Sequence, residues 1–92
     1  MIKKNLKVNN KLGLHARPAT ALVKLAQKFR SSITLHKVNN EEKKADCKSV
    51  ISILLLGANK GTELVLCSIG DDAHNAIEEI SNFFNRNFDE VI

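Results

Sequence analysis

Residues 13–29, with the sequence GLHARPATALVKLAQKF, contain the change from loop to amphipathic helix that decides the fold. From Ala16 onward, apolar residues recur at helical spacing and polar residues occupy a different face. The apolar face holds Ala19, Leu22, Val23, Ala26 and Phe29, and the polar face holds Arg17, Thr20, Lys24 and Gln27. Pro18 fits the first turn, because a residue there has no intrahelical N–H bond to lose. The pattern predicts a helix from Ala16 that is broken at Ser31-Ser32.

Segments on both sides of this helix have the character of strands. Residues 5–8 and 33–36 alternate between apolar and polar side chains, as in strands that are packed on one face. A polar turn at residues 39–41 leads into a charged stretch up to Cys47, which is typical of an edge strand. Residues 64–69 form the strongest predicted strand.

Two further helices complete the predicted fold. Ser49 and Gly57 have the residue types of an N-cap and a C-cap around a short apolar helix. Residues 70–72 open a last helix, whose predicted inner face is Ala73, Ala76, Ile77, Ile80 and Phe84. The order βαββαβα predicts an α+β fold, an open-faced β-sandwich with a four-stranded antiparallel sheet and three helices on one face. Residues 1–92 are expected to form one domain.

Composition narrows the class of function. The net charge is +4, but the Lys and Arg are scattered, and the chain has no Trp or Tyr to stack bases, which disfavours nucleic-acid binding. The longest apolar run, residues 53–56, is too short to cross a bilayer, and no secretory signal follows the N-terminus, so we expect a cytoplasmic protein. Cys47 and Cys67 fit neither a disulfide framework nor a metal site and are expected to be packed thiols. We expect no cofactor and no metal.

His15 is the candidate for chemistry, because it immediately precedes the predicted helix. The first N–H groups of a helix have no internal partner and the macrodipole is positive there, so this end can bind an anion. The Arg17 guanidinium adds a fixed charge and a fork of donors for phosphate oxygens. An unprotonated imidazole beside the Ala16 and Arg17 amides could attack phosphorus. The competing interpretation is that His15 is an ordinary helix-start residue.

Other polar residues are interpreted as structural. His36 and His74 are expected at the surface, away from any companion. Asp71 and Asp72 fit a helix first turn, where acids are favoured, and the glutamates at 78 and 79 fit a solvated face.

The segment from Asn10 to Thr20, NKLGLHARPAT, closely resembles the phosphorylation site of HPr, the histidine phosphocarrier family of the bacterial phosphoenolpyruvate-dependent phosphotransferase system. Residues 48–51 resemble the family's regulatory serine segment, and residues 56–61 its exit from the second helix. The resemblance covers nearly the whole chain and implies a phosphoryl carrier rather than a self-sufficient enzyme. His15 would be phosphorylated on Nδ1 by phospho-enzyme I and would donate to enzyme IIA components for sugar uptake.

The resemblance also implies further roles and leaves alternatives open. Ser49 would match a serine that a dedicated kinase modifies in some bacteria, although a plain N-cap role explains it equally. The segment 37–45 looks longer than the tight turn of typical sugar-type carriers, and the ending Phe88-Asp89-Glu90 resembles NPr, the nitrogen-branch paralogue. Gly13-Leu14 and residues 57–61 favour the sugar-type carrier. A regulatory protein that uses the Ser49 face, or a small RNA-binding module, are the other hypotheses.

The short helix is apolar almost all round, so part of it must face water if it packs on a sheet. The resemblance assigns Ile53 and Leu56 to the core and leaves Ile51 and Leu54 outward near His15. We therefore expect a monomer that uses this surface to dock on its partners. The residues expected in that surface are Thr20, Lys24, Gln27, Val50, Ile51 and Leu54.

Overall fold

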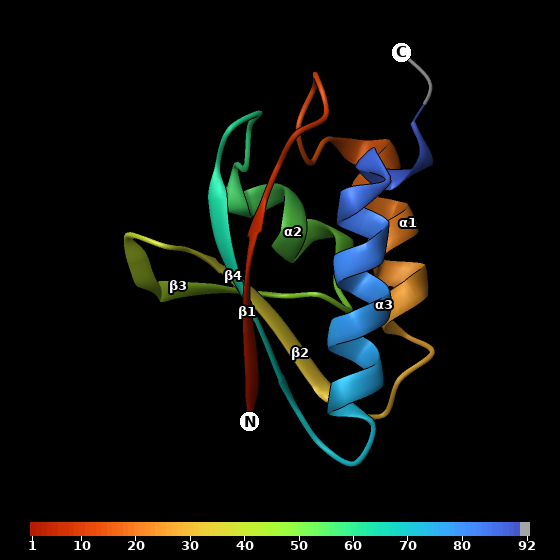
Figure 1. The fold of residues 1–92 in the computed structure, drawn as a ribbon. Helices are drawn as coiled ribbons and strands as arrows, with labels where there is room; N and C mark the ends of the chain where they lie inside the picture. Colours follow the sequence, from red (N-terminus) through yellow and green to blue (C-terminus); the bar gives the residue numbers. More distant parts are fainter. Residues whose placement is uncertain (91–92) are drawn as a thin grey trace.

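The structure is a computed structural model that describes residues 1–90, which form four strands and three helices (Figure 1). The observed order is the predicted βαββαβα. The elements are β1 (Ile2–Lys7), α1 (Ala16–Ala26), β2 (Ser32–Lys37), β3 (Asn40–Asp46), α2 (Val50–Leu56), β4 (Glu63–Ile69) and α3 (Ala73–Asn85), followed by a short turn, η1 (Asn87–Asp89).

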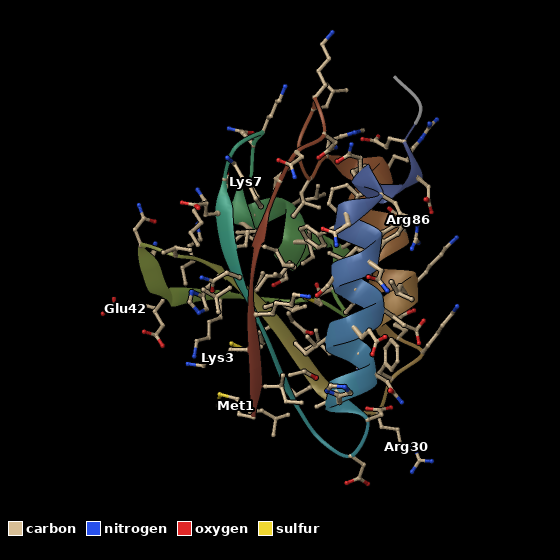
Figure 2. All side chains as sticks on the ribbon, in the orientation of Figure 1. Met1, Lys3, Lys7, Arg30, Glu42 and Arg86 are labelled. Carbon is tan, nitrogen blue, oxygen red and sulfur yellow. The ribbon has the colours of Figure 1, made fainter. Side chains whose placement is uncertain are left out.

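The four strands form one sheet in the order β1-β4-β2-β3, with every neighbouring pair antiparallel. The helices lie on one face: α3 packs against β1 and β4, α2 packs against β3, and α1 packs against both helices (Figure 1). On the other face, exposed charged side chains such as Lys3 and Glu42 project away from the helices (Figure 2). This arrangement is the predicted open-faced β-sandwich.

The core lies between the sheet and the helices and is mainly aliphatic. The residues predicted for the inner faces of the two long helices are all buried, as are alternate residues of the strands. The largest fully buried apolar side chains are Phe84, Leu22, Ile33, Leu35, Ile53, Leu64, Leu66, Ile80 and Val8. Each such side chain contributes roughly 1.5–3 kcal/mol by leaving water. Among the described residues, no helix is both long enough and apolar enough to cross a membrane.

The α1 helix ends at Ala26, earlier than the predicted break at Ser31-Ser32. Beyond it the chain tightens, because the amides of Lys28 and Phe29 bond to carbonyls three residues back, at 3.1 Å each. The Lys48 ammonium donates to the carbonyl oxygen of Phe29 at 2.7 Å. A side chain from the segment before α2 therefore satisfies a carbonyl acceptor in the turn that follows α1.

The β2–β3 hairpin differs from the prediction in two ways. Its turn lies at residues 38–39 rather than 39–41, and the extra length of the segment is taken up inside β3. Leu35 pairs with Ala45 and Lys37 with Asn40, so residues 41–44 lie opposite His36 alone. The prediction that His36 is a surface residue is wrong: it is 4% exposed, and its Nδ1 bonds to the carbonyl oxygen of Lys37 at 2.9 Å. Alternation with the buried Ile33 and Leu35 predicts an exposed side chain at His36, whereas the structure buries it.

Asp72 holds the start of α3 against the chain that follows α1. Its carboxylate accepts from the amides of Arg30 (2.9 Å) and Ser31 (3.0 Å) and from the Ser31 hydroxyl. These bonds lower the pKa of Asp72 to about 2, and the Ser31 hydroxyl has the largest effect, with the Arg30 amide second. Asp72 is the N-cap residue, but its side chain makes no capping bond. Its main role is thus a long-range tie rather than the local helix contact that the sequence predicts.

Candidate functional site

The backbone before α1 is set by the contact of its loop with the segment that follows α2. The Leu14 amide donates to the carbonyl oxygen of Ala58 at 2.9 Å. Gly13 has a φ of +70°, and a Cβ there would lie 2.5 Å from the same oxygen. Only glycine tolerates both the left-handed conformation and this approach. The loop therefore delivers His15 to the helix start in an extended conformation, with φ −82° and ψ −171°.

His15 is the N-cap residue of α1, yet its side chain makes no capping hydrogen bond. The first backbone bond of the helix runs from the Ala19 amide to the His15 carbonyl oxygen, at 3.0 Å. The amides of Ala16 and Arg17 have no acceptor within the helix, and both residues are exposed. The positive end of the helix dipole and the N–H groups of Ala16 and Arg17 thus lie beside the imidazole, and both features favour the binding of an anion.

The imidazole itself has a partner that the sequence analysis did not find. His15 Nε2 lies 2.8 Å from Glu90 Oε2, and the other Glu90 oxygen accepts from Asn10 Nδ2 at 2.6 Å. The Asn10 amide also donates to the Gly13 carbonyl oxygen at 2.8 Å. The His15 side chain is 33% exposed, whereas that of Glu90 is only 4% exposed. The imidazole is therefore partly exposed to solvent, while its Nε2 atom is bonded to a nearly buried carboxylate.

This contact fixes which ring nitrogen can act as a nucleophile. An ionised carboxylate only accepts hydrogen bonds, so Nε2 carries the proton that is donated to Glu90. In the neutral ring, Nδ1 then holds the free lone pair. The chemistry available at the site is attack by Nδ1 on an electrophile bound at the start of α1.

The turn η1 brings Glu90 to this position. Asn87, Phe88 and Asp89 all have left-handed φ values, of 53°, 58° and 57°. Such a conformation costs roughly 1–2 kcal/mol per residue for most side chains. The buried Phe88 ring offsets that cost by packing edge-on against Phe83 and Phe84, with centroids 5.4 and 4.7 Å apart. The chain therefore turns sideways after α3 and lies beside α1 (Figure 1).

The polar face of α1 continues from the imidazole as a shallow depression. It is lined by Ala16, Arg17, Thr20, Ala21 and Lys24. The Thr20 hydroxyl donates to the Ala16 carbonyl oxygen at 2.8 Å. Gln27 is exposed at the end of the same helix. All four predicted polar-face residues thus lie on the surface.

The α2 helix, which packs against α1, has an exposed apolar face. Ile51 is 70% exposed, Leu54 41% and Leu55 66%, whereas Ile53 and Leu56 are buried. Val50 is half-buried. The division between core and surface is the expected one, with Leu55 as an additional exposed residue.

Ser49 occupies the predicted N-cap of α2. Its hydroxyl oxygen accepts from the Ser52 amide at 3.3 Å, and its φ of −130° and ψ of 117° are those of an extended cap residue. Gly57 ends the helix in the left-handed conformation, as predicted. Ser49 is half-buried, so the residue remains partly accessible to solvent.

The remaining candidate groups lie apart from this site. His74 is exposed, as predicted, and lies 4.0 Å from the Glu78 carboxylate. Cys47 and Cys67 are both buried free thiols. Burial raises the pKa of Cys47 above its usual range, so this thiol is not a nucleophile.

The chain is similar in sequence to known proteins along nearly its whole length. A family model described as "PTS HPr component phosphorylation site" matches residues 2–86. The chain is 37% identical over 90 residues to phosphocarrier protein HPr of Xylella fastidiosa, which covers 98% of both chains. It is 36% identical over 89 residues to phosphocarrier protein NPr of Escherichia coli K12, which covers 97% of both.

Similarity extends to the three-dimensional structure. The crystal structure of HPr-C-His from Thermoanaerobacter tengcongensis matches with a TM-score of 0.91 and 37% identity, over 100% of both chains. Sequence and fold thus agree over nearly the full length of the chain. The chain belongs to the HPr family, the histidine-containing phosphocarrier proteins of the bacterial phosphoenolpyruvate-dependent phosphotransferase system.

Proposed function

We propose that His15 is the phosphoryl acceptor and donor of this phosphocarrier. The observation that carries the proposal is the position of its ring, with Nε2 bonded to Glu90 and Nδ1 left without a capping bond at the start of α1. The Ala16 and Arg17 amides and the Arg17 guanidinium hold the phosphoryl oxygens. Phosphoryl transfer needs positioning and charge stabilisation, and these groups supply both.

As a phosphocarrier of this system, the chain has enzyme I and enzyme IIA proteins as partners. Within our proposal these partners bind the surface formed by the polar face of α1 and the exposed face of α2. An apolar cluster with basic residues at its edge, Arg17 and Lys24, suits a partner that presents apolar side chains and acidic groups. Ile51 and Leu54 are the apolar centre of this docking surface, with Val50, Thr20 and Gln27 around it.

The branch of the system is part of the proposal. We assign the chain to the sugar branch, on the residues Gly13-Leu14 and the segment 57–61. The nitrogen-branch carrier NPr is the alternative, supported by the ending Phe88-Asp89-Glu90 and by an NPr relative of almost equal identity. Purified enzyme I of each type, supplied with phosphoenolpyruvate, discriminates between them. The sugar assignment predicts faster labelling by the sugar-type enzyme.

Regulation at Ser49 is also part of the proposal. Ser49 is the site that a serine kinase of the host would modify, since it lies at the cap of the docking helix.

The carrier works as a monomer in the cytoplasm, although HPr from Thermoanaerobacter tengcongensis also crystallises as a dimer. Sedimentation of the unphosphorylated protein tests the oligomeric state, and a dimer at micromolar concentration would contradict it.

The labelling assay tests the proposed acceptor directly. The parent protein should gain an acid-labile, base-stable phosphoryl group from phosphoenolpyruvate and enzyme I, and His15→Ala should gain none. His74→Ala is the matched control, because it removes an exposed imidazole elsewhere on the surface. Acid-labile label that persists in His15→Ala would overturn the assignment.

A further inference from the structure

The Glu90 carboxylate is nearly buried, and within residues 1–90 it forms no ion pair with a lysine or arginine. With a side chain only 4% exposed, it is compensated by the His15 ring at one oxygen and the Asn10 amide at the other. A carboxylate withdrawn from water is costly unless hydrogen bonds replace the lost hydration. Its placement therefore calls for a role beyond a surface ion pair.

We propose that Glu90 is a positioning residue that keeps a proton on His15 Nε2 throughout the phosphorylation cycle. The inference rests on the proposed function of His15 as phosphoryl acceptor. Asn10 supports the arrangement by holding the carboxylate in place. The three residues form a chain of contacts, Asn10–Glu90–His15, which we call the site triad.

The orientation of Asn10 in the site triad follows from its neighbours. The atom at 2.6 Å from Glu90 Oε1 is also 2.8 Å from the Gly13 carbonyl oxygen. Both neighbours are acceptors, so this atom must be the NH₂ group and the amide cannot be flipped. Because Gly13 belongs to the loop that positions His15, Asn10 couples the carboxylate to the backbone that places the ring.

The proton on Nε2 matters for both halves of the cycle. In the accepting step, the Nδ1 lone pair bonds to phosphorus while the bond to the donor's leaving atom breaks, and that electron pair stays with the donor. The ring then carries the phosphoryl group on Nδ1, a proton on Nε2 and a formal positive charge. The negative Glu90 carboxylate, 2.8 Å from Nε2 in the unphosphorylated protein, balances that charge.

The donating step depends on the same proton. The bond between phosphorus and Nδ1 breaks, and its electron pair returns to Nδ1 as the phosphoryl group moves to the acceptor. With Nε2 protonated, the ring leaves as a neutral imidazole. Without that proton it would have to leave as an imidazolate anion, which is a far poorer leaving group. Glu90 therefore favours donation as well as acceptance.

A purely mechanical role for Glu90, as a clasp for the chain after α3, is less consistent with the surrounding contacts. Phe88 already anchors this segment against Phe83 and Phe84. Arg86, at the end of α3 (Figure 2), also bonds the Asp89 carboxylate at 2.9 Å. The segment thus has two other attachments, while Glu90 makes the contact with the ring.

The test compares Glu90→Ala with Glu79→Ala, which removes an exposed carboxylate from α3. Proton NMR of the parent should show a ring N–H signal of His15 that exchanges slowly, in both the free and phosphorylated forms. Glu90→Ala should lose this signal, and its phosphorylated form should return the group to dephosphorylated enzyme I roughly ten- to a hundredfold more slowly. Glu79→Ala should match the parent in both measurements.

The outcomes separate this inference from the proposed function. If Glu90→Ala keeps the ring N–H signal, or donates within twofold of Glu79→Ala, the positioning role is overturned while His15 remains the acceptor. If His15→Ala is still labelled, the proposed function itself fails. A variant with a lowered Tm but an unchanged signal and donor rate would show that Glu90 is only a clasp, which also overturns the inference.

Discussion

Replacing Ile51 by aspartate places a charge in the centre of the proposed docking surface while leaving the core intact. The side chain is 70% exposed, so the substitution buries no new charge in the folded protein. Surface changes of this kind usually alter the free energy of unfolding by no more than about 0.5 kcal/mol. The expected loss is therefore in partner binding, not in folding.

The structure also sets the size of that loss. Full burial of an isoleucine side chain is worth roughly 1.5–3 kcal/mol. Docking can bury at most the 70% of Ile51 that is still exposed, which gives roughly 1–2 kcal/mol. That energy corresponds to a rise in the KM for enzyme I of roughly six- to thirtyfold. Desolvation of the new carboxylate would increase it further.

The assay is steady-state phosphorylation by enzyme I, combined with a thermal melt. Ile69→Asp is the matched control, because Ile69 is 52% exposed but lies at the end of β4, outside the docking surface. Its KM should equal that of the parent. A KM for Ile51→Asp within twofold of the Ile69→Asp control would refute the docking proposal. A loss of several kcal/mol in stability would refute the reasoning from exposure.

Three further perturbations test other parts of the account. Arg17→Ala should reduce kcat/KM by roughly ten- to a hundredfold, because one charge-assisted contact is lost. The control variant Arg30→Ala removes an exposed cation elsewhere and should leave kcat/KM unchanged. Equal kcat/KM values for the two variants would show that Arg17 does not belong to the site. Ser49→Asp should raise the KM for enzyme I at low salt more than Ser32→Asp does at the exposed first residue of β2, and an unchanged KM would count against an acidic partner surface at Ser49. Asp72 has a pKa of about 2 in the folded protein against an ordinary value of 3.8, so it stabilises the fold above about pH 4, and this contribution is lost as the pH falls towards 2. The stability difference between the parent and Asp72→Asn in urea melts should therefore shrink over that range, and a difference independent of pH would contradict the proposed tie.

The sequence predicted the features that depend on local patterns. The apolar spacing of α1 gave its start and its buried face, although the helix ends at Ala26 because the Lys28 and Phe29 amides bond three residues back. Ser49 and Gly57 gave both ends of α2, since cap residues act through their own turn. The position of His15 at the start of α1 was likewise predicted from the sequence, because His15 immediately precedes the first residue of the amphipathic pattern.

Features that depend on contacts between distant segments were not predictable in this way. Glu90 is 75 residues from His15, and its approach requires a left-handed turn at a phenylalanine, which no propensity favours. Asp72 bonds to residues 41 and 42 positions away, so its sequence position at a helix start was misleading. His36 is buried although it alternates along β2 with the core residues Ile33 and Leu35, so the alternation did not predict its burial.

The most direct test of the central claim is to locate the phosphoryl group on the protein. After reaction with phosphoenolpyruvate and enzyme I, phosphorus–nitrogen coupling in protein labelled with ¹⁵N-histidine identifies both the residue and the ring atom. We predict a single phosphorylated histidine, His15, with phosphorus bonded to Nδ1 and a proton on Nε2. Phosphorus bonded to Nε2, or to His36 or His74, would contradict the account, because the contact with Glu90 leaves only Nδ1 of His15 free to react.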